Sequence, residues 1–236
     1  MPSATAVRSA RLTAFVAQSP FDRQPILAFM EAVAARLPAG STVLDAGAGD
    51  APYRELFAHC DYKTSDWTNS VHEGAQAVDF VASLDALPIP DRSFDTVLNT
   101  QVLEHVAEPL AVVRELRRVL VPGGELCLTV PLVNELHEEP YDFYRYTPYA
   151  LRSLFEQAGL EVLSIEPLTG FYTTLAALLR SAGLITGVQA QGDLARRALA
   201  AAMRMVAPAL PRLDRLDRRR ALPLGYVCRA RRPQGT

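Results

Sequence analysis

Two glycines separated by one residue, Gly47 and Gly49, directly follow the apolar run 42–46. A glycine turn after a strand lets a ligand approach the backbone closely, because glycine has no side chain and adopts positive φ angles. In open α/β sheets, ligands bind at the carboxyl ends of the strands, where such a turn lies. This turn therefore predicts an α/β sheet with a ligand site at the end of its first strand.

The residues around the turn select the kind of ligand. The dinucleotide-binding form of the turn needs a third glycine where this chain has Pro52. Asp45 and Asp50 bracket the turn, and their carboxylates repel a pyrophosphate but attract a cation. The turn thus disfavours a nicotinamide dinucleotide. It favours a ligand with ammonium and sulfonium charges and no phosphate, such as S-adenosylmethionine.

Apolar runs and amphipathic helices alternate along the chain. Strands are predicted at residues 42–46, 61–66, 77–81, 96–99, 125–131, 160–166 and 224–230. Helices are predicted at residues 22–37, after Pro52 with Asp50 as its cap, at 109–120, and from Thr147 to Gly159. Such alternation builds a parallel sheet covered on both faces. The predicted fold is α/β: a Rossmann-like doubly wound seven-stranded mostly parallel sheet, with an antiparallel last strand and a helical insert before it.

The length of 236 residues with 49% hydrophobic residues fits one domain better than two. Within it we expect an N-terminal helical segment at 1–38, a cofactor-binding core at 39–170, a helical insert at 171–221, and the last strand and tail at 222–236. The net charge of −2 hides an asymmetry, since residues 180–236 contain 12 arginines and 3 aspartates. The insert and tail are therefore electrostatically different from the core.

Cysteine usage and apolar runs bear on location. The three cysteines lie far apart, without the close pairing of a zinc site or a disulfide framework. We therefore expect no metal ligand and a reducing, cytoplasmic environment. The apolar run 12–17 is too short for the core of a signal peptide, and the run 171–188 is broken by Arg180 and polar residues, so it falls short of a membrane span.

The second predicted strand ends in an acid. Asp66 stands 21 residues after Asp45, at the place where a carboxylate accepts hydrogen bonds from both ribose hydroxyls in a doubly wound fold. The next residue, Trp67, either covers one face of an adenine or packs within the protein. The sequence leaves both interpretations of Trp67 open.

Several ordered motifs carry a resemblance to a known family. They are Asp45-Ala46-Gly47-Ala48-Gly49, Asp66, and the segments 87–95, 102–106, 118–124 and 158–160. Together they resemble the class I S-adenosylmethionine-dependent methyltransferases of the ubiquinone- and menaquinone-biosynthesis type.

This resemblance implies a set of cofactor contacts. The loop after the third strand would contact the adenine with Ser83 and Leu84, although the family often has Asp where this chain has Ser83. The end of the fourth strand would line the methionine part of the cofactor, and Tyr53 either reaches its carboxylate or packs on the first helix. The expected cofactor-binding residues are Asp45, Ala46, Gly47, Gly49, Tyr53, Asp66, Trp67, Ser83, Leu84, Asn99, Thr100 and Gln101.

The loop 137–147, after the fifth predicted strand, concentrates polar chemistry: a histidine, three acids, three tyrosines and an arginine. Methyl transfer to oxygen is a displacement at an already activated carbon, so placing the acceptor supplies much of the rate and a base is optional. We predict that His137 acts as the general base. The predicted acceptor pocket is formed by His105, Tyr141, Asp142 and Arg145.

Each of these assignments has a structural alternative. The loop 137–147 can satisfy its own polar groups, with Arg145 pairing Asp142 and Thr147 capping the next helix. His105 opens a helix, where capping or packing is favoured over a chemical role.

Residues 171–220 are predicted to form two or three helices without a strand. Leu194, Ala198, Ala201 and Met205 make an apolar face that alternates with arginines. A lid over the acceptor site is favoured, and the alternative is peripheral contact of 171–220 with the inner face of an anionic membrane. Nucleic acid is not expected as a partner, because the arginines lack interleaved aromatic residues and a reading motif.

The leading functional prediction is O-methylation of a small molecule, a sugar or a glycan-pathway intermediate with S-adenosylmethionine as cofactor. The glycan class is implied by the loop 137–147, which resembles one recurring in methyltransferases of glycan and secondary-metabolite pathways. The alternative from another class is a catalytically weak, methyltransferase-like protein that binds the cofactor and works as a partner or scaffold.

Overall fold

The computed structural model describes residues 8–72, 74, 77–181, 198, 201–203 and 205–235. Its strands are β1 (Thr42–Ala46), β2 (Asp61–Asp66), β3 (Phe80–Val81), β4 (Phe94–Thr100), β5 (Leu120–Pro131), β6 (Glu161–Pro167) and β7 (Gly225–Arg231). Its α-helices are α1 (Ala10–Gln18), α2 (Pro20–Ala34), α3 (Pro109–Val119), α4 (Pro148–Gln157) and α5 (Phe171–Ser181), and its 3₁₀ helices include η1 (Arg54–Phe57), η3 (Leu103–His105) and η5 (Ala207–Leu216).

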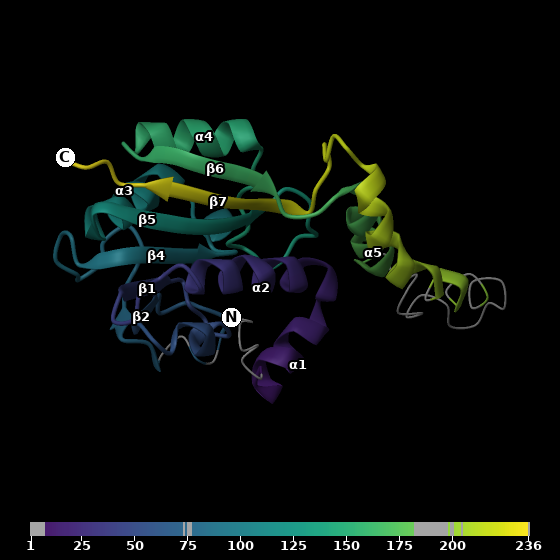
Figure 1. Cartoon of the computed structure of the whole chain (residues 1–236), viewed down its shortest axis with the longest axis horizontal. Helices are drawn as coiled ribbons and strands as arrows, with labels where there is room; N and C mark the ends of the chain where they lie inside the picture. Colours follow the sequence, from purple (N-terminus) through teal and green to yellow (C-terminus); the bar gives the residue numbers. More distant parts are fainter. Residues whose placement is uncertain are drawn as a thin grey trace.

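The strands form one seven-stranded sheet in the order β3-β2-β1-β4-β5-β7-β6 (Figure 1). β1 pairs in parallel with both β2 and β4, whereas β7 lies antiparallel between β5 and β6. The strand order reverses between β1 and β4, and ligands bind in the crevice that such a reversal opens at the carboxyl ends of the strands. The predicted fold class, including its antiparallel last strand, is confirmed.

Apolar side chains bury both faces of the sheet. On one face, Leu116 of α3 and Phe155 of α4 pack with Leu126 of β5 in a single cluster. On the other face, a second cluster joins Met30 of α2 to Val43 of β1. Two packed faces hold the strands rigidly, so that the loops at their carboxyl ends are positioned by a stable scaffold.

The helix that begins at Thr147 forms as predicted. The Thr147 hydroxyl accepts a hydrogen bond from the Ala150 amide at 3.2 Å, and Pro148 occupies the first turn. Gly159 follows the helix with a φ of +78°, a conformation that glycine adopts without strain. Capping chemistry was therefore sufficient to predict both ends of α4.

The helix predicted after Pro52 is wrong. Only the four-residue 3₁₀ helix η1 forms there, without a side-chain cap. Ala51 has a φ of +47°, which breaks a helical path directly after the glycine turn. The Asp50 carboxylate instead accepts a hydrogen bond from the Gly74 amide at 2.8 Å, so the cofactor turn lacks the α-helix N-terminus expected beside it.

The described part of the insert packs beyond the carboxyl end of β6 as α5 and η5 (Figure 1). Within residues 171–181, 198, 201–203 and 205–220, no strand forms, as predicted. The predicted apolar face falls partly outside the described residues, because Leu194 is not among them. In the part of the chain that is described, no helix has the length and apolar character that crossing a membrane requires.

Candidate active site

The glycine turn after β1 has the geometry of a ligand cradle. Gly47 and Gly49 have φ values of +82° and +51°. A Cβ atom on Gly47 would lie 2.5 Å from the Cγ2 atom of Val102, inside the closest approach that carbon atoms tolerate. Both glycines are therefore required by backbone conformation, and Gly47 also by lack of space.

Asp66 connects the end of β2 to this turn. Its buried carboxylate accepts hydrogen bonds from the Gly49 amide at 2.6 Å and from the Trp67 amide at 2.7 Å. Burial raises the pKa of Asp66 above its usual value, although the two amides oppose the shift. The acid that the sequence places at the end of β2 thus lies beside the glycine turn, within reach of a ligand that the turn holds.

Asp45 lies at the end of β1, where it is 4% exposed. The Tyr62 hydroxyl donates a hydrogen bond to its carboxylate. Burial, opposed by this hydrogen bond, raises the pKa of Asp45 to about 6. Two acids in such a dry location favour a ligand that brings positive charge, because a cation near them offsets the cost of ionising them.

The end of β4 completes the crevice next to β1. The Asn99 side-chain amide donates to the Ala46 carbonyl at 2.8 Å, and its Oδ1 atom is buried without a hydrogen-bond partner on a described residue. Gln101 has a φ of +55° and donates from Nε2 to the Thr129 hydroxyl at 3.1 Å. Thr100 lies between them and is partly exposed. The unpaired amide oxygen of Asn99 is a polar group that a bound ligand can satisfy.

Three expected cofactor contacts lie in other surroundings. Tyr53 is buried and packs edge-to-face on Phe15 of α1, with ring centroids 5.8 Å apart. Leu84 is buried in the core cluster, and Ser83 is exposed. Tyr53 therefore packs within the protein against α1, and the helix predicted to carry it does not form.

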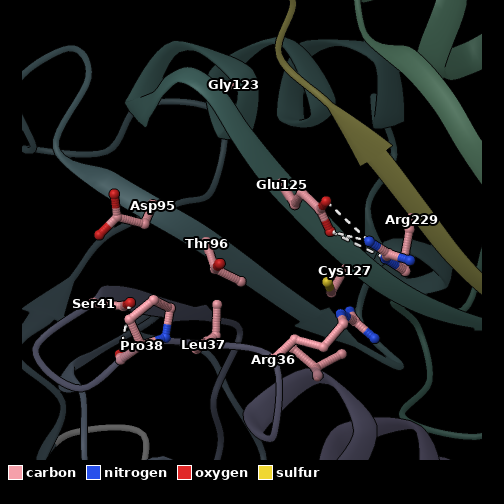
Figure 2. A pocket seen from close by; sticks show the side chains of 11 residues that line it. Arg36, Leu37, Pro38, Ser41, Asp95, Thr96, Gly123, Glu125, Cys127 and Arg229 are labelled. Carbon is pink, nitrogen blue, oxygen red and sulfur yellow. Dashed lines mark hydrogen bonds and ion pairs between the residues drawn. The ribbon is translucent and has the colours of Figure 1, made fainter.

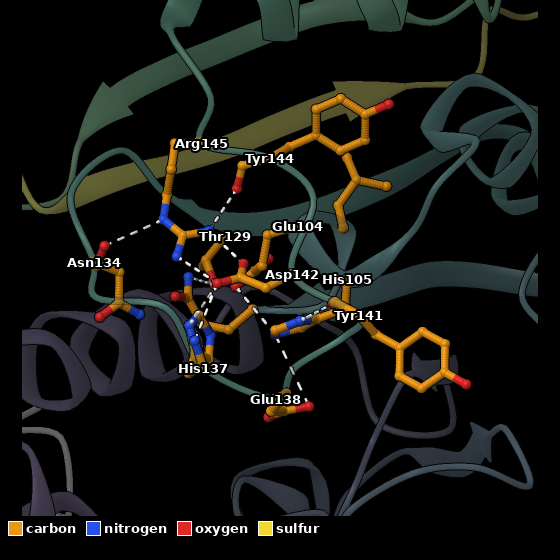
Figure 3. Close-up of polar contacts among 12 residues, drawn as sticks. Glu104, His105, Thr129, Asn134, His137, Glu138, Tyr141, Asp142, Tyr144 and Arg145 are labelled. Atoms are coloured by element: carbon orange, nitrogen blue, oxygen red, sulfur yellow. Dashed lines mark hydrogen bonds and ion pairs between the residues drawn. The ribbon is translucent and has the colours of Figure 1, made fainter.

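The loop after β5 is held by an internal ion pair (Figure 3). Arg145 binds both carboxylate oxygens of Asp142, at 2.6 and 2.9 Å. This guanidinium holds the pKa of Asp142 well below its usual range. Asp142 also accepts from the His137 amide at 3.0 Å. Arg145 and Asp142 are therefore engaged with the loop itself, and their geometry fixes the position of His137.

A histidine pair and a buried acid meet beside this loop. The rings of His105 and His137 lie 4.7 Å apart, edge to face. The Nε2 atom of His105 lies 3.9 Å from Oε1 of Glu104, whose side chain is fully buried. Burial raises the pKa of Glu104 to about 8. Figure 3 shows the three side chains pointing toward one another from η3 and the loop after β5.

The loops that follow β2 and β5 touch each other. Trp67 packs edge-to-face on Tyr141, with ring centroids 4.8 Å apart. His72 lies 3.7 Å from a carboxylate oxygen of Glu138 and 3.9 Å from one of Asp50. These contacts bring the expected cofactor residues and the expected acceptor residues into one continuous site.

Sequence reasoning missed three residues of this site. None of Glu104, Glu138 and His72 was predicted as a site residue. Glu104 had a usable signal, because it stands next to His105 after the fourth strand. His72 carried none, since its position depends on how the loop after β2 folds over the glycine turn.

The structure contains a cavity of about 410 Å³ away from this site (Figure 2). It lies between the end of α2 and the first residues of β4 and β5, and an ion pair of Arg229 with Glu125 at 2.8 Å forms part of its wall. Asp95 and Thr96 at its rim mark the amino ends of the parallel strands. The cavity is therefore at the sheet edge opposite the glycine turn.

Comparisons with known proteins agree with the fold and the turn. Residues 44–128 match the family model described as a methyltransferase domain. A ubiquinone biosynthesis O-methyltransferase of Dinoroseobacter shibae is 32% identical over 144 residues, which cover 54% of this chain and 53% of that relative. The chain thus spans about half the length of the curated relatives it matches.

Solved structures share the fold at low sequence identity. The [4+2]-cyclase SpnF matches with a TM-score of 0.57 and 24% identity, covering 90% of this chain and 83% of that one. Phosphoethanolamine N-methyltransferase 2 of Haemonchus contortus, in complex with S-adenosyl-L-methionine, matches with a TM-score of 0.56 and 12% identity, covering 97% of this chain and 61% of that one.

The fold, the site and these matches define a class. Over residues 44–128 the chain matches a methyltransferase domain, and the resemblance to class I S-adenosylmethionine-dependent methyltransferases that was inferred from its motifs is confirmed. S-adenosylmethionine is the cofactor of this class. Its cationic ammonium and sulfonium fit the buried carboxylates of Asp45 and Asp66, and the close approach that Gly47 permits fits a ligand lying on the backbone of the turn.

Proposed function

We propose that this protein transfers the methyl group of S-adenosylmethionine to a hydroxyl oxygen of a small molecule. The observation that carries the proposal is the contact between the two loops: Trp67 from the cofactor side packs on Tyr141 from the acceptor side at 4.8 Å. A methyl group held at the turn would thereby face the histidine pair. Such placement can supply much of the acceleration of an in-line displacement.

In this proposal the cofactor lies across the carboxyl ends of β1, β2 and β4. Asp66 accepts hydrogen bonds from the ribose hydroxyls, and Trp67 covers the adenine together with the loop of Ser83 and Leu84. Asn99, Thr100 and Gln101 line the methionine part. The buried Asn99 Oδ1 atom, which lacks a hydrogen-bond partner on a described residue, supports this placement.

His137 is the proposed base that accepts the proton of the acceptor hydroxyl. Its Nδ1 atom lies 3.0 Å from the Glu135 carbonyl oxygen. A carbonyl oxygen only accepts hydrogen bonds, so Nδ1 carries a hydrogen, and in the neutral ring Nε2 keeps the lone pair that a base needs. Asp142 and Arg145 act as positioning residues, because they hold the His137 amide and the turn of the loop.

The proposed acceptor is a polyhydroxyl compound such as a sugar or a glycan-pathway intermediate. The name of the Dinoroseobacter relative, a ubiquinone biosynthesis O-methyltransferase, supports oxygen as the accepting atom. The tyrosines and acids of the loop after β5 suit a ligand with several hydroxyl groups, which hydrogen-bond to both kinds of side chain.

Turnover with a panel of acceptors tests this function. The purified chain is incubated with labelled S-adenosylmethionine and sugars, nucleotide sugars, phenols or carboxylic acids, and S-adenosylhomocysteine is measured. We expect turnover with a hydroxyl acceptor and a loss of at least 100-fold in kcat for His137→Ala. Near-normal turnover of His137→Ala would show that His137 is not the base. Tight cofactor binding without turnover on any acceptor would favour the scaffold alternative.

A second proposal concerns the exposed surface of α5, of η5 and of Met205, which precedes η5. Leu178, Met205 and Leu216 are 45%, 82% and 64% exposed, and η5 and the residues after it contribute several arginines. Exposed apolar side chains near basic groups suit peripheral contact with an anionic membrane. We expect co-sedimentation with phosphatidylglycerol vesicles at low salt and none with phosphatidylcholine vesicles. Equal recovery of the protein in the supernatants of both kinds of vesicle would contradict the membrane proposal.

A further inference from the structure

Three side chains that bind metals in other proteins converge beside the acceptor loop. Glu104, His105 and His137 each offer one ligand atom, and these atoms all lie within 4.8 Å of one another. Glu104 and His105 come from η3 after β4, whereas His137 comes from the loop after β5. Residues far apart in the sequence are thus brought to one point at the carboxyl edge of the sheet.

The carboxylate of Glu104 is buried without the hydrogen-bond partners that buried acids usually have. It is fully buried, and neither of its carboxylate oxygens finds a hydrogen-bond partner on another described residue. Burying an unpaired ionised carboxylate costs roughly several kcal/mol, so folded proteins protonate such groups, pair them or use them to coordinate metals. The Nε2 atom of His105 lies 3.9 Å from Oε1 of Glu104, beyond hydrogen-bonding distance.

Both histidines are oriented as metal ligands are. The Nδ1 atom of His105 lies 2.7 Å from the Tyr141 carbonyl oxygen, and that of His137 lies 3.0 Å from the Glu135 carbonyl oxygen. Because carbonyl oxygens only accept, each Nδ1 carries a hydrogen, and in the neutral ring each Nε2 keeps a free lone pair. A hydrogen bond from the second ring nitrogen to a carbonyl is the usual support of a metal-bound histidine.

We propose that Glu104, His105 and His137 bind one divalent transition-metal ion that holds the acceptor oxygen. Two imidazoles and one carboxylate suit Zn²⁺, Mn²⁺ or Fe²⁺ better than Mg²⁺ or Ca²⁺, which prefer oxygen ligands. Three protein ligands leave coordination positions open for a substrate. Glu138, with Oε2 at 4.0 Å from Nε2 of His105, is near enough to contribute a further oxygen after a small adjustment.

This inference rests on the proposed methyl transfer and changes one part of it. An acceptor hydroxyl bound to the ion has a lowered pKa and releases its proton to solvent. The resulting alkoxide oxygen forms a bond to the methyl carbon, and the carbon–sulfur bond breaks with its electron pair staying on sulfur, which yields S-adenosylhomocysteine. With the ion bound, Nε2 of His137 is a ligand, so the ion replaces this ring as the group that activates the hydroxyl.

Metal binding is tested directly with Zn²⁺ and with Mn²⁺. The chain is treated with EDTA, dialysed and titrated with each metal by calorimetry, and metal content is measured after gel filtration. We expect one equivalent for the wild type and a loss in affinity of at least 10- to 100-fold for Glu104→Gln and for His137→Gln. His59→Gln is the matched control, because His59 is an exposed histidine that is not one of the three proposed ligands, and its Nε2 atom lies 3.2 Å from the Leu37 carbonyl oxygen.

Thermal unfolding distinguishes a variant that has lost the metal site from one that does not fold. The metal should raise the Tm of the wild type and of His59→Gln, but not that of Glu104→Gln or His137→Gln. The inference is overturned if the wild type binds neither metal, or if all four proteins bind equally. S-adenosylmethionine affinity is measured on the same EDTA-treated samples. If the cofactor binds and the metals do not, only the proposed metal site is wrong. If the cofactor does not bind, the proposed function is wrong.

Discussion

The absence of a Cβ atom at Gly47 shapes the cofactor turn. Gly47 and Gly40 both have a φ of +82°, so any other residue pays the same backbone cost at either position. They differ in their surroundings: a Cβ at Gly47 meets Val102 at 2.5 Å, whereas a Cβ at Gly40 has nothing within 4 Å. The pair therefore separates the cost of backbone strain from the cost of lost space.

Gly47→Ala should weaken S-adenosylmethionine binding by at least 10-fold, because the turn must shift to accommodate the methyl group. It should also lower the free energy of unfolding by about 2–4 kcal/mol, the sum of backbone strain and overpacking. Gly40→Ala should cost only about 1–2 kcal/mol and leave cofactor affinity unchanged. Calorimetric titration and urea unfolding of both variants check this, and equal effects would show that space at Gly47 does not matter.

Asp45 gives the stability of the ligand-free protein a pH dependence. Its pKa is raised from 3.8 to about 6, chiefly by burial. The folded protein therefore keeps a proton that the unfolded chain releases between about pH 4 and pH 6. The contribution of Asp45 to the free energy of unfolding falls as pH rises through this window, by up to about 3 kcal/mol.

Asp45→Asn should remove this part of the pH dependence, since an amide does not titrate. We expect the variant to match the wild type near pH 4 and to be more stable than it at pH 7. Urea unfolding at several pH values measures the difference, and Asp61→Asn, an exposed acid on β2, serves as the control. Parallel curves for the wild type and Asp45→Asn would contradict the assignment.

At the scale of elements, one carboxylate connects η5 to the start of α5. Asp214 of η5 accepts hydrogen bonds from the amides of Gly170, Tyr172 and Thr173 at 2.9, 2.9 and 3.0 Å. These are the amides that the start of α5 leaves without helical partners. A Cβ on Gly170 would lie 2.6 Å from Cγ of Asp214, so this glycine allows the approach.

Asp214→Asn should release the start of α5, because hydrogen bonds to a carboxylate are stronger than those to an amide. We expect a loss of about 1–2 kcal/mol and roughly 10-fold faster hydrogen exchange at the amides of residues 172–175, since 1.4 kcal/mol corresponds to a factor of ten. Glu156→Gln, which alters only an exposed pair with Arg152 at 3.9 Å, should exchange like the wild type. Unchanged exchange in Asp214→Asn would mean that other contacts hold α5.

The elements that sequence predicted correctly share a local signal. The seven strands and α4 are specified by apolar runs and by capping residues such as Thr147. Two other features had no such signal. The helix predicted after Pro52 does not form, because Ala51 is left-handed. The site closes over the turn through the contact of Trp67 with Tyr141, which joins two loops far apart in the sequence. The position of Asp66 at the end of β2 was predictable, because the strand predicted at residues 61–66 has the same bounds as β2. The convergence of Glu104 and His137 depends on tertiary structure.

At the scale of the whole molecule, the fold specifies where a ligand binds but not which reaction follows. The match to the [4+2]-cyclase SpnF illustrates this, since a protein named for a different reaction shares this architecture. The reaction must therefore be argued from the site. Here the candidate cofactor residues lie at the carboxyl ends of β1, β2 and β4, which are neighbours in one sheet. A ligand bound there therefore couples to the folding of the sheet.

S-adenosylhomocysteine should accordingly stabilise the whole domain. At a ligand concentration of about 100 times Kd, the gain is about 2.7 kcal/mol, which for a chain of this length corresponds to a rise in Tm of roughly 5–10 °C. NAD at the same concentration should give no rise, because Pro52 and the buried acids disfavour a pyrophosphate. Asp66→Asn should reduce the shift, since the amide presents fewer acceptors to the ribose hydroxyls. Differential scanning calorimetry measures all three, and a larger rise with NAD than with S-adenosylhomocysteine would assign the turn to a dinucleotide.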